Sequence, residues 1–391
     1  MLDRRDLRGK FAIVGVGEPA VINTVRDKSE HQMAAESVIN AANEAGISIK
    51  DIDGVFMCGG PTPNDLQTYM GIFPSYADSG GIGAASPIAM VEHAISALAA
   101  GMCRIAVVVQ GNSPRSQIGL ARAGRGGDSS ATFAGQWLTP YGLTGEFCRH
   151  GFVANLYNKT YGTTMMGFAE IAAQTRAWAT MSPKAAFRDP ITAEDVLNSE
   201  MISDPMTILM CCPRLDYAGA FIITSAERAQ SLKKKPVYIL GTSQAFEKNI
   251  DNKDDMLRWK NIRRAAPRLW AMAGVQPRDI QIAQTHDCFI PVPVLELEGL
   301  GFCADGEGLD FLAHGRSGPG GRFPMNTNGG GLSYNHAGTF GIASIIENTV
   351  QLRGEAPKEK QVKGAQIGIV AGSGGGFTIH TDVVMSTDPR P

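Results

Sequence analysis

Short apolar runs alternate with amphipathic stretches along the chain, as in proteins where buried strands alternate with helices. Residues 11–16 form an apolar run that predicts a strand, and helical spacing of apolar residues follows over 29–45. Ser29 and Gln32 have the spacing of a capping box, and Gly46 is placed to end the helix. A strand predicted at 54–57 completes a strand–helix–strand unit.

A similar unit returns in the second half of the chain. Residues 237–241 predict a strand, 261–273 a helix, and 282–285 another strand. Gly274 ends this helix 228 residues after Gly46 ends the first one.

A further pair of helices follows the same order in both halves. Ser86 is the predicted N-cap of a helix that stops at Gly101 before a strand. Its counterpart runs over 339–353 and stops at Gly354, again before a strand. Two sets of landmarks in one order indicate two α/β halves related by a pseudo-twofold, against the alternative of chance similarity between common α/β units.

The region 113–205 interrupts the first half. It is richer in Gly, Arg, Met and Thr than its surroundings and shows no strand alternation. We interpret it as a loop excursion from the first half that covers a cleft. The chain is therefore predicted to divide into residues 1–235, with the excursion, and residues 236–391.

Composition and charge exclude several classes of function. Of 391 residues 43% are apolar and 19% charged, and the net charge is -2, so no basic excess indicates nucleic-acid binding. No apolar run predicts a membrane span, and the N-terminus lacks the apolar core of a signal peptide. The seven cysteines are scattered without metal-ligand spacing, which favours reduced thiols in the cytoplasm and no metal site.

The segment 326–336 carries the clearest candidate chemistry. It reads Asn-Thr-Asn-Gly-Gly-Gly-Leu-Ser-Tyr-Asn-His and precedes the helix predicted at 339–353. The imidazole of His336 can exchange a proton near neutral pH, and a helix N-terminus beside it favours a developing negative charge. Gly15 and Gly17 mimic a dinucleotide fingerprint, but the next helix begins only near Ser29, which argues against a nucleotide site.

Four segments together resemble motifs of the thiolase superfamily, over essentially the whole chain. They are Asn326-Thr-Asn-Gly-Gly with His336, His286-Asp-Cys-Phe289, the glycine loop 371–376, and Cys212-Pro-Arg-Leu-Asp216. The His-Asp-x-Phe motif is typical of the sterol-carrier-protein-type thiolases and their lipid-transfer-protein relatives. The resemblance implies the thiolase fold: two βαβαβαββ halves stacked as α/β/α/β/α layers, with a loop excursion from the first half.

The chain departs from this family at both sulfur positions. The nucleophilic cysteine of the family falls at Ala84, in Gly80-Gly-Ile-Gly-Ala-Ala-Ser86, and its second cysteine falls at Gly372. Alanine cannot form the covalent acyl-enzyme of a thiolase. Loss of a covalent nucleophile costs about 10⁶-fold in rate in a well-studied case.

The resemblance assigns roles to the remaining motif residues. His286 and His336 are implied near the acyl carbonyl as oxyanion donors and proton-transfer groups, with Asp287 in an orienting role. Cys288 is interpreted as a small residue packed behind the site rather than a substitute nucleophile. The implied oxyanion and glycine-loop residues are Gly372, Gly374 and Gly375, and the implied substrate-binding residues are Asn328, Gly329 and Gly330.

Two classes of function follow from this set of residues. The first is an enzyme of this acyltransferase family that cleaves or forms a C–C bond on an acyl-CoA thioester, either by a cysteine-independent, aldolase-like reaction or as an inactivated thiolase. The second is a non-catalytic acyl-CoA-binding or scaffolding subunit of a thiolase complex. The retained histidines favour the first and the two lost cysteines favour the second.

The resemblance also implies partners. Coenzyme A thioester is expected as substrate, with no covalently bound cofactor. A homodimer formed through the sheet edges is expected, with a small OB-fold, zinc-ribbon protein as a possible further partner.

Overall fold

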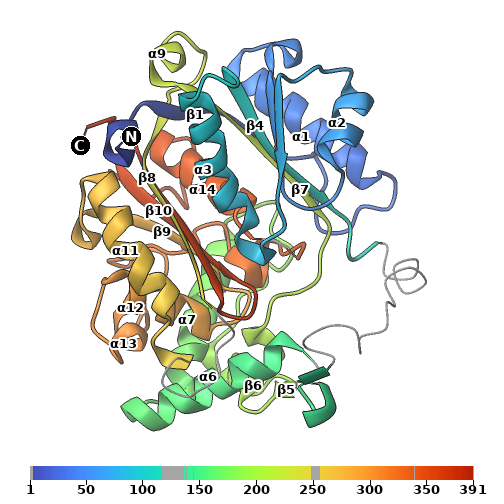
Figure 1. Ribbon diagram of the computed structural model, residues 1–391. Coiled ribbons are helices and arrows are strands. Elements are labelled where there is room, and N and C mark those ends of the chain that lie inside the picture. The colour runs from blue at the N-terminus through green and yellow to red at the C-terminus, as the bar shows by residue number, and fades with distance from the viewer. Residues whose placement is uncertain are drawn as a thin grey trace.

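A nine-stranded sheet organises the computed structural model, which describes residues 3–116, 136–137, 139–143, 145–247, 256–338 and 340–390 (Figure 1). The strand order is β3-β2-β4-β7-β1-β8-β11-β10-β9. Strands β1 and β8 meet over only two residue pairs, Ala12 with Tyr238 and Ile13 with Val237. This short ladder separates a first-half sheet from a second-half sheet.

The first half follows the predicted order of strands and helices. Its elements are β1 (Phe11–Gly17), α1 (Glu30–Ala45), β2 (Gly54–Met57), α2 (Pro63–Met70), β3 (Tyr76–Ser79), α3 (Ser86–Ala99), β4 (Ile105–Asn112) and, beyond the excursion, β7 (Tyr217–Ser225) and the short α9 (Ala226–Ala229).

The second half repeats this order with one change. In the place of β3, a single parallel bridge joins Met325 to Ala283 of β9. The sheet order Met325-β9-β10-β11-β8 therefore matches β3-β2-β4-β7-β1, which confirms the duplicated βαβαβαββ plan. The elements are β8 (Val237–Phe246), α11 (Lys260–Ala273), β9 (Ile282–Thr285), α12 (Pro291–Leu300), α13 (Gly308–Leu312), α14 (Ile342–Arg353), β10 (Ile367–Gly374) and β11 (Ile379–Ser386).

Alternating side chains on the strands create the predicted five layers. Ile13 of β1 packs inward against α3 and α14, while Val14 packs outward against α1. In the second half, Val370 joins the same central layer, whereas Ile369 faces α11 and α12. Figure 1 shows α3 and α14 between the strands of the two halves. The α/β/α/β/α arrangement is confirmed.

The ends of the helices agree with local sequence signals, with one exception. The Ser29 side chain accepts a hydrogen bond from the Gln32 amide in a complete capping box, and Gly46 ends α1 with φ 74°. The prediction of Ser86 as an N-cap is wrong, because the 3-10 turn Gly83–Ala85 runs directly into α3. The Ser86 hydroxyl serves that turn instead, donating to the Gly83 carbonyl.

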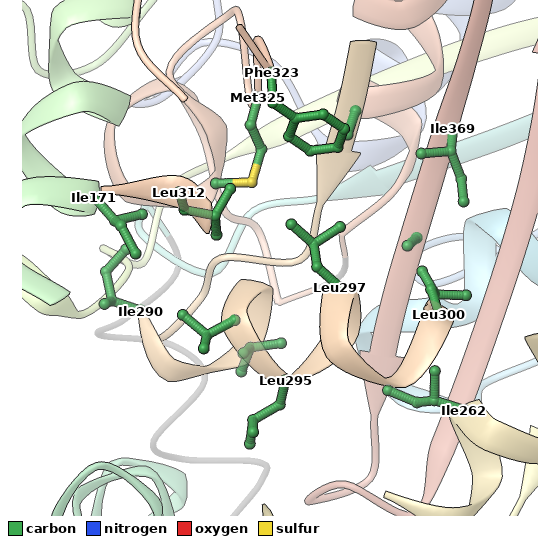
Figure 2. Close-up of a cluster of buried hydrophobic side chains, with 14 of the residues drawn as sticks. Ile171, Ile262, Ile290, Leu295, Leu297, Leu300, Leu312, Phe323, Met325 and Ile369 are labelled. Carbon is green, nitrogen blue, oxygen red and sulfur yellow. The ribbon is translucent and has the colours of Figure 1, made fainter. Parts of the chain in front are cut away.

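The described part of the excursion is largely helical rather than a loop. It contains α6 (Glu146–Tyr161), α7 (Met165–Thr180), α8 (Ala193–Leu197), β5 (Met201–Ser203) and β6 (Met206–Thr207). The residues at 117–135, 138 and 144 lie outside the described residues. The excursion leaves the first half but packs on the second: Figure 2 shows Ile171 of α7 within one apolar cluster with Ile290 and Leu295. These segments form helices because each helix buries an apolar face. The lack of strand alternation in the sequence did not reveal these helical faces.

None of the helices among the described residues combines the length and apolar character needed to cross a membrane.

Candidate active site

One cavity collects residues from both halves and from the excursion. Its volume is about 820 Å³. It is walled by the turn before α3, the loop between β9 and α12, the segment before α14, the glycine loop after β10, and α6. The sequence-predicted residues that line it are Ala84, His286, His336, Gly374 and Gly375, with Cys288 beside them.

Two stacked imidazoles form the centre of one wall. The ring centroids of His286 and His336 lie 5.9 Å apart, with 16° between the ring planes. Within the described part of the chain, the Nε2 atom of each ring is buried and has no hydrogen-bond partner. Buried polar atoms are nearly always paired, so two orphaned nitrogens beside a cavity indicate a place where a ligand supplies the partner.

Burial keeps both imidazoles neutral. It lowers the pKa of His336 to about 4. The pKa of His286 is lowered well below its usual value by burial and by the neighbouring imidazoles of His336 and His150. Both rings are therefore uncharged at neutral pH.

The second nitrogen of each ring has a defined neighbour. The Gly338 amide donates to Nδ1 of His336 at 3.3 Å. A neutral His336 that accepts at Nδ1 carries its proton on Nε2. Nδ1 of His286 lies 3.9 Å from Sγ of Cys288, whose thiol pKa is raised well above normal by burial.

Ala84 lies at the tip of the turn before α3, against the glycine loop. Its carbonyl accepts a hydrogen bond from the Phe340 amide at 2.8 Å. A Cβ added to Gly374 would lie 3.3 Å from the Ala84 nitrogen, and one added to Gly83 would lie 3.1 Å from the Gly375 nitrogen. The turn and the loop thus approach each other as closely as glycine permits.

The thiols that line the cavity are not activated. Burial raises the pKa of Cys211 to about 12 and raises those of Cys212 and Cys288 further. The thiolate is the nucleophilic form of cysteine, so among the described residues no cavity thiol is a prepared nucleophile.

Another group of predicted residues lies behind the lining of the cavity and supports it. The Asp287 carboxylate accepts a hydrogen bond from the Gly331 amide at 2.6 Å, and Asn328 accepts one from the Gly330 amide at 2.8 Å. Gly330 has φ 57°, and a Cβ there would collide with an Asp287 oxygen. Asp287, Asn328, Gly329 and Gly330 therefore shape the segment that carries His336, and none of them lines the cavity.

Gly372 is also separated from the cavity. It lies within β10, where an added Cβ would meet Ile88 of α3 at 2.7 Å. The structure brings the two histidines, Ala84, Gly374 and Gly375 together but leaves Gly372 in the central layer. The catalytic and binding roles of all these residues stay predictions.

His150 is a cavity residue that no sequence motif selected. It stacks on Phe289 with a centroid distance of 4.0 Å and meets Phe377 edge-on at 4.6 Å, and Phe377 stacks on Trp259 at 4.7 Å. Burial lowers the pKa of His150 to about 3. Its place depends on how α6 packs over the second half, for which no local sequence signal exists.

The end of the excursion fixes both histidine segments. The Cys212 amide donates to the Cys288 carbonyl at 2.8 Å, and the Leu215 amide donates to the His336 carbonyl at 3.1 Å. The 212–216 motif thus holds the segments that carry His286 and His336 in place relative to each other.

One set of side chains in the described residues converges as metal ligands would. Ligand atoms of His286, Cys288 and His336 lie within 4.8 Å of one another. Atoms that share one zinc ion lie closer, roughly 3.3–3.8 Å apart for bonds of about 2.0–2.3 Å in a tetrahedron. The geometry is looser than that of a formed zinc site, and the expectation of no metal stays a prediction.

Comparison with known proteins shows which family the chain resembles. Residues 243–387 match the family model described as thiolase C-terminal domain-like. The chain is 34% identical, over 89% of its length and 92% of the relative, to the 17-hydroxy-3-oxo-4-pregnene-20-carboxyl-CoA lyase of Mycobacterium tuberculosis. It is 33% identical to the steroid side-chain-cleaving aldolase of Thermomonospora curvata, over 87% and 90% of the two chains. The solved structure of an Ltp2-ChsH2(DUF35) aldolase superposes with a TM-score of 0.87 at 29% identity, covering 97% of this chain and 98% of that one.

Proposed function

The chain belongs to the thiolase superfamily, in its sterol-carrier-protein-type branch, and from this premise we propose that it cleaves a β-hydroxyacyl-CoA thioester by a cysteine-independent retro-aldol reaction. The observation that carries the proposal is one cavity that holds an alanine at the nucleophile position and two neutral imidazoles whose Nε2 atoms have no partner among the described residues.

The reaction needs one base and one oxyanion site. A base takes the proton of the β-hydroxyl group, the Cα–Cβ bond breaks, and the β-carbon becomes a ketone or aldehyde. The electron pair of the broken bond forms a thioester enolate, which takes a proton at Cα to give the shortened acyl-CoA. No oxidant and no acyl-enzyme takes part, so the missing thiol is no obstacle.

The two histidines suit these two tasks. His336, with its proton on Nε2, donates to the enolate oxygen, and a preorganised donor in a dry site stabilises such charge strongly. His286 then acts as the base through Nε2, with its own proton held on Nδ1 toward Sγ of Cys288, and returns the proton that it takes to Cα. Because both pKa values are lowered, both rings hold their neutral forms at physiological pH.

Relatives support a bulky acyl group for the substrate. One is named 17-hydroxy-3-oxo-4-pregnene-20-carboxyl-CoA lyase, and another is named a steroid side-chain-cleaving aldolase. The cavity wall of Phe289, His150 and Phe377 offers flat apolar surface to such a ring system. We propose a polycyclic β-hydroxyacyl-CoA with the hydroxyl on a ring carbon. The lyase and aldolase names also favour an enzyme over a scaffolding subunit.

Mass-spectrometric product analysis tests this proposal. Incubation with a 17-hydroxy steroid 20-carboxyl-CoA thioester should yield a ketosteroid and the shortened acyl-CoA in equal amounts. A His336→Ala variant should lose the products, and His93→Ala, which alters a residue paired with Asp78 outside the cavity, should keep them. Cleavage that persists in His336→Ala would refute the assignment of the oxyanion donor.

We further propose that each chain divides into the halves 1–235 and 236–391, that it forms a homodimer in the cytoplasm, and that it has a small partner protein. The edge strand β3 and the exposed Phe73, 92% accessible, support a dimer contact at the first-half sheet edge. The similar Ltp2-ChsH2(DUF35) aldolase is named for two components, which supports a partner. Light scattering of the purified chain, with and without a co-expressed partner, tests the homodimer and the partner.

A further inference from the structure

A buried chain of polar side chains lies behind the cavity, and the proposed reaction does not use it. It runs from Glu296 of α12 to Ser373 of β10, then to His380 and Asp382 of β11, and ends at Ser243 of β8. Ser373 is 3% exposed and the other four are at most 1% exposed. Burial of so many ionisable groups is costly unless their hydrogen bonds are satisfied, so the chain calls for an explanation.

Each proton in this chain can be assigned. Ser243 donates to Asp382 at 2.6 Å, and Asp382 lies 2.8 Å from Nε2 of His380. Nδ1 of His380 lies 3.2 Å from the Ser373 oxygen, and Ser373 donates to Glu296 at 2.7 Å. With Ser373 donating to Glu296, both His380 nitrogens act as donors and the ring is an imidazolium between two carboxylates.

The Glu296 end of this series of hydrogen-bonded side chains reaches the proposed active site. The second oxygen of Glu296 accepts a hydrogen bond from the His286 amide at 3.1 Å. Ser373 lines the cavity and directly precedes Gly374 and Gly375. One carboxylate therefore joins the main chain of His286, just after β9, to Ser373 of the glycine loop, near the end of β10.

We infer that Glu296 is a positioning residue: it sets the distance between His286 and the glycine loop, and the Ser373–His380–Asp382–Ser243 chain holds its carboxylate in place. This inference rests on the proposed function, because it concerns the same cavity. Strands β9 and β10 are parallel neighbours that pair up to Thr285 and Ala371, so nothing in the ladder itself fixes the residues beyond that pair. Strand β11 holds β10 as far as Gly374, and the carboxylate adds a direct link between the end of β10 and the residue after β9.

The charges around the chain agree with a role in holding rather than in proton transfer to substrate. Glu296 is fully buried and faces His380 and Asp382 of β11, with Ser373 of β10 between them. The pKa of His380 is raised by Asp382 and Glu296 against the opposing effect of burial. Burial raises the pKa of Glu296 to about 7, yet its protonated form keeps the same contacts if His380 gives up its Nδ1 proton and Ser373 turns its hydroxyl toward that atom.

Three substitutions at position 296 separate positioning from charge. In Glu296→Gln the amide oxygen accepts from His286 and the amide group donates to Ser373. With one carboxylate removed, His380 gives up its Nδ1 proton and accepts there from Ser373, so most of kcat should remain. Glu296→Leu and Glu296→Ala remove both contacts and should lower kcat roughly 10²-fold with KM nearly unchanged, as expected for a displacement near 1 Å. A Leu variant with the kcat of the wild type would overturn the inference.

Glu298 provides a matched control on the same helix. It is 3% exposed, accepts from Tyr157 at 2.6 Å and from the Gly306 and Gly308 amides at 3.0 Å, and does not line the cavity. Glu298→Leu should lower the unfolding temperature but keep kcat per folded molecule. If the two leucine variants lose kcat equally, Glu296 is only a structural residue and the inference fails.

A crystal structure of Glu296→Leu gives a readout that does not depend on turnover. The inference predicts that the His286 main chain and the glycine loop separate in this variant and stay in place in Glu296→Gln. If the wild type cleaves no β-hydroxyacyl-CoA, the proposed function fails, and the two structures still decide the inference. An unchanged distance in Glu296→Leu would overturn it whatever the activity.

Discussion

The turn before α3 and the segment before α14 occupy equivalent places in the duplicated fold but differ in chemistry. The first half presents Ala84 to the cavity and the second half presents His336. His286, Cys288 and the glycine loop also come from the second half, and His150 comes from the excursion. The two halves thus contribute equivalent segments to the cavity wall. Most of the side chains that can accept or donate a proton there belong to the second half.

Placing a thiol in the first half would break this asymmetry most strongly. In Ala84→Cys the new side chain lies in the turn at the N-terminus of α3, where a helix dipole lowers a thiol pKa below its usual value of about 8.5. We expect this variant to form a covalent acyl adduct with an acyl-CoA, visible in the intact mass, whereas the wild type forms none. An adduct on the wild type would show that a native cysteine, such as Cys288, is reactive after all.

Removal of a second-half group should cause the next largest effect. His286→Ala deletes the proposed base, and a positioned acid or base contributes roughly 10²–10⁴-fold to a rate. Steady-state assays should show a loss of kcat in that range. His314→Ala is the control, because that side chain is exposed and pairs with Glu170 away from the cavity. A loss below tenfold in His286→Ala would place the base elsewhere.

The pH dependence of kcat should reflect buried rather than exposed histidines. His336 has a pKa of about 4, and the pKa of His286, the proposed base, is lowered well below its usual value, so the rate should not fall where an unperturbed histidine titrates but only at lower pH. The folded state disfavours the protonated ring, so the stability tied to His336 is complete above pH 6.5 and is lost progressively as the pH falls toward 4. Glu296 also titrates near pH 7, so an acid limb between about pH 6 and 7 would contradict the burial of these rings only if it persists in Glu296→Gln.

The smallest expected effect is on the free energy of unfolding, and it concerns a difference between the outer helices of the two halves. Helix α1 is preceded by the N-cap Ser29 in a capping box, whereas the N-cap of the equivalent α11 is Trp259, which makes no side-chain capping hydrogen bond. Ser29→Ala should lower the free energy of unfolding by about 1 kcal/mol and leave kcat unchanged. Urea unfolding measures the change, and an unaltered midpoint would mean that the cap does not limit stability.

Local signals were enough to predict much of this fold. Several predictions that depend only on neighbours in sequence are confirmed. They are the capping box of Ser29 and Gln32, the helix ends at Gly46 and Gly274, and the apolar runs that form strands. The N-cap at Ser86 failed because the preceding residues form a turn of their own. The helix predicted from 339 begins at Ile342, and residue 339 lies outside the described residues.

The candidate site was predictable only where a motif identified it. The structure places His286 and His336 in one cavity, and the motifs had associated them with one site. His150, Glu296 and His380 carry no such motif, since they reach the site by the packing of α6, α12 and β11 from three distant parts of the chain. Contacts of this kind are set by tertiary structure, which spacing along one sequence does not encode.

The ring stack at the cavity gives the protein an optical reporter of its own. Trp259 is 2% exposed and stacks on Phe377, which lines the cavity. A ligand that displaces Phe377 alters the surroundings of the indole without touching it. Occupancy of the site should therefore be readable from intrinsic fluorescence, with no label attached and no turnover required.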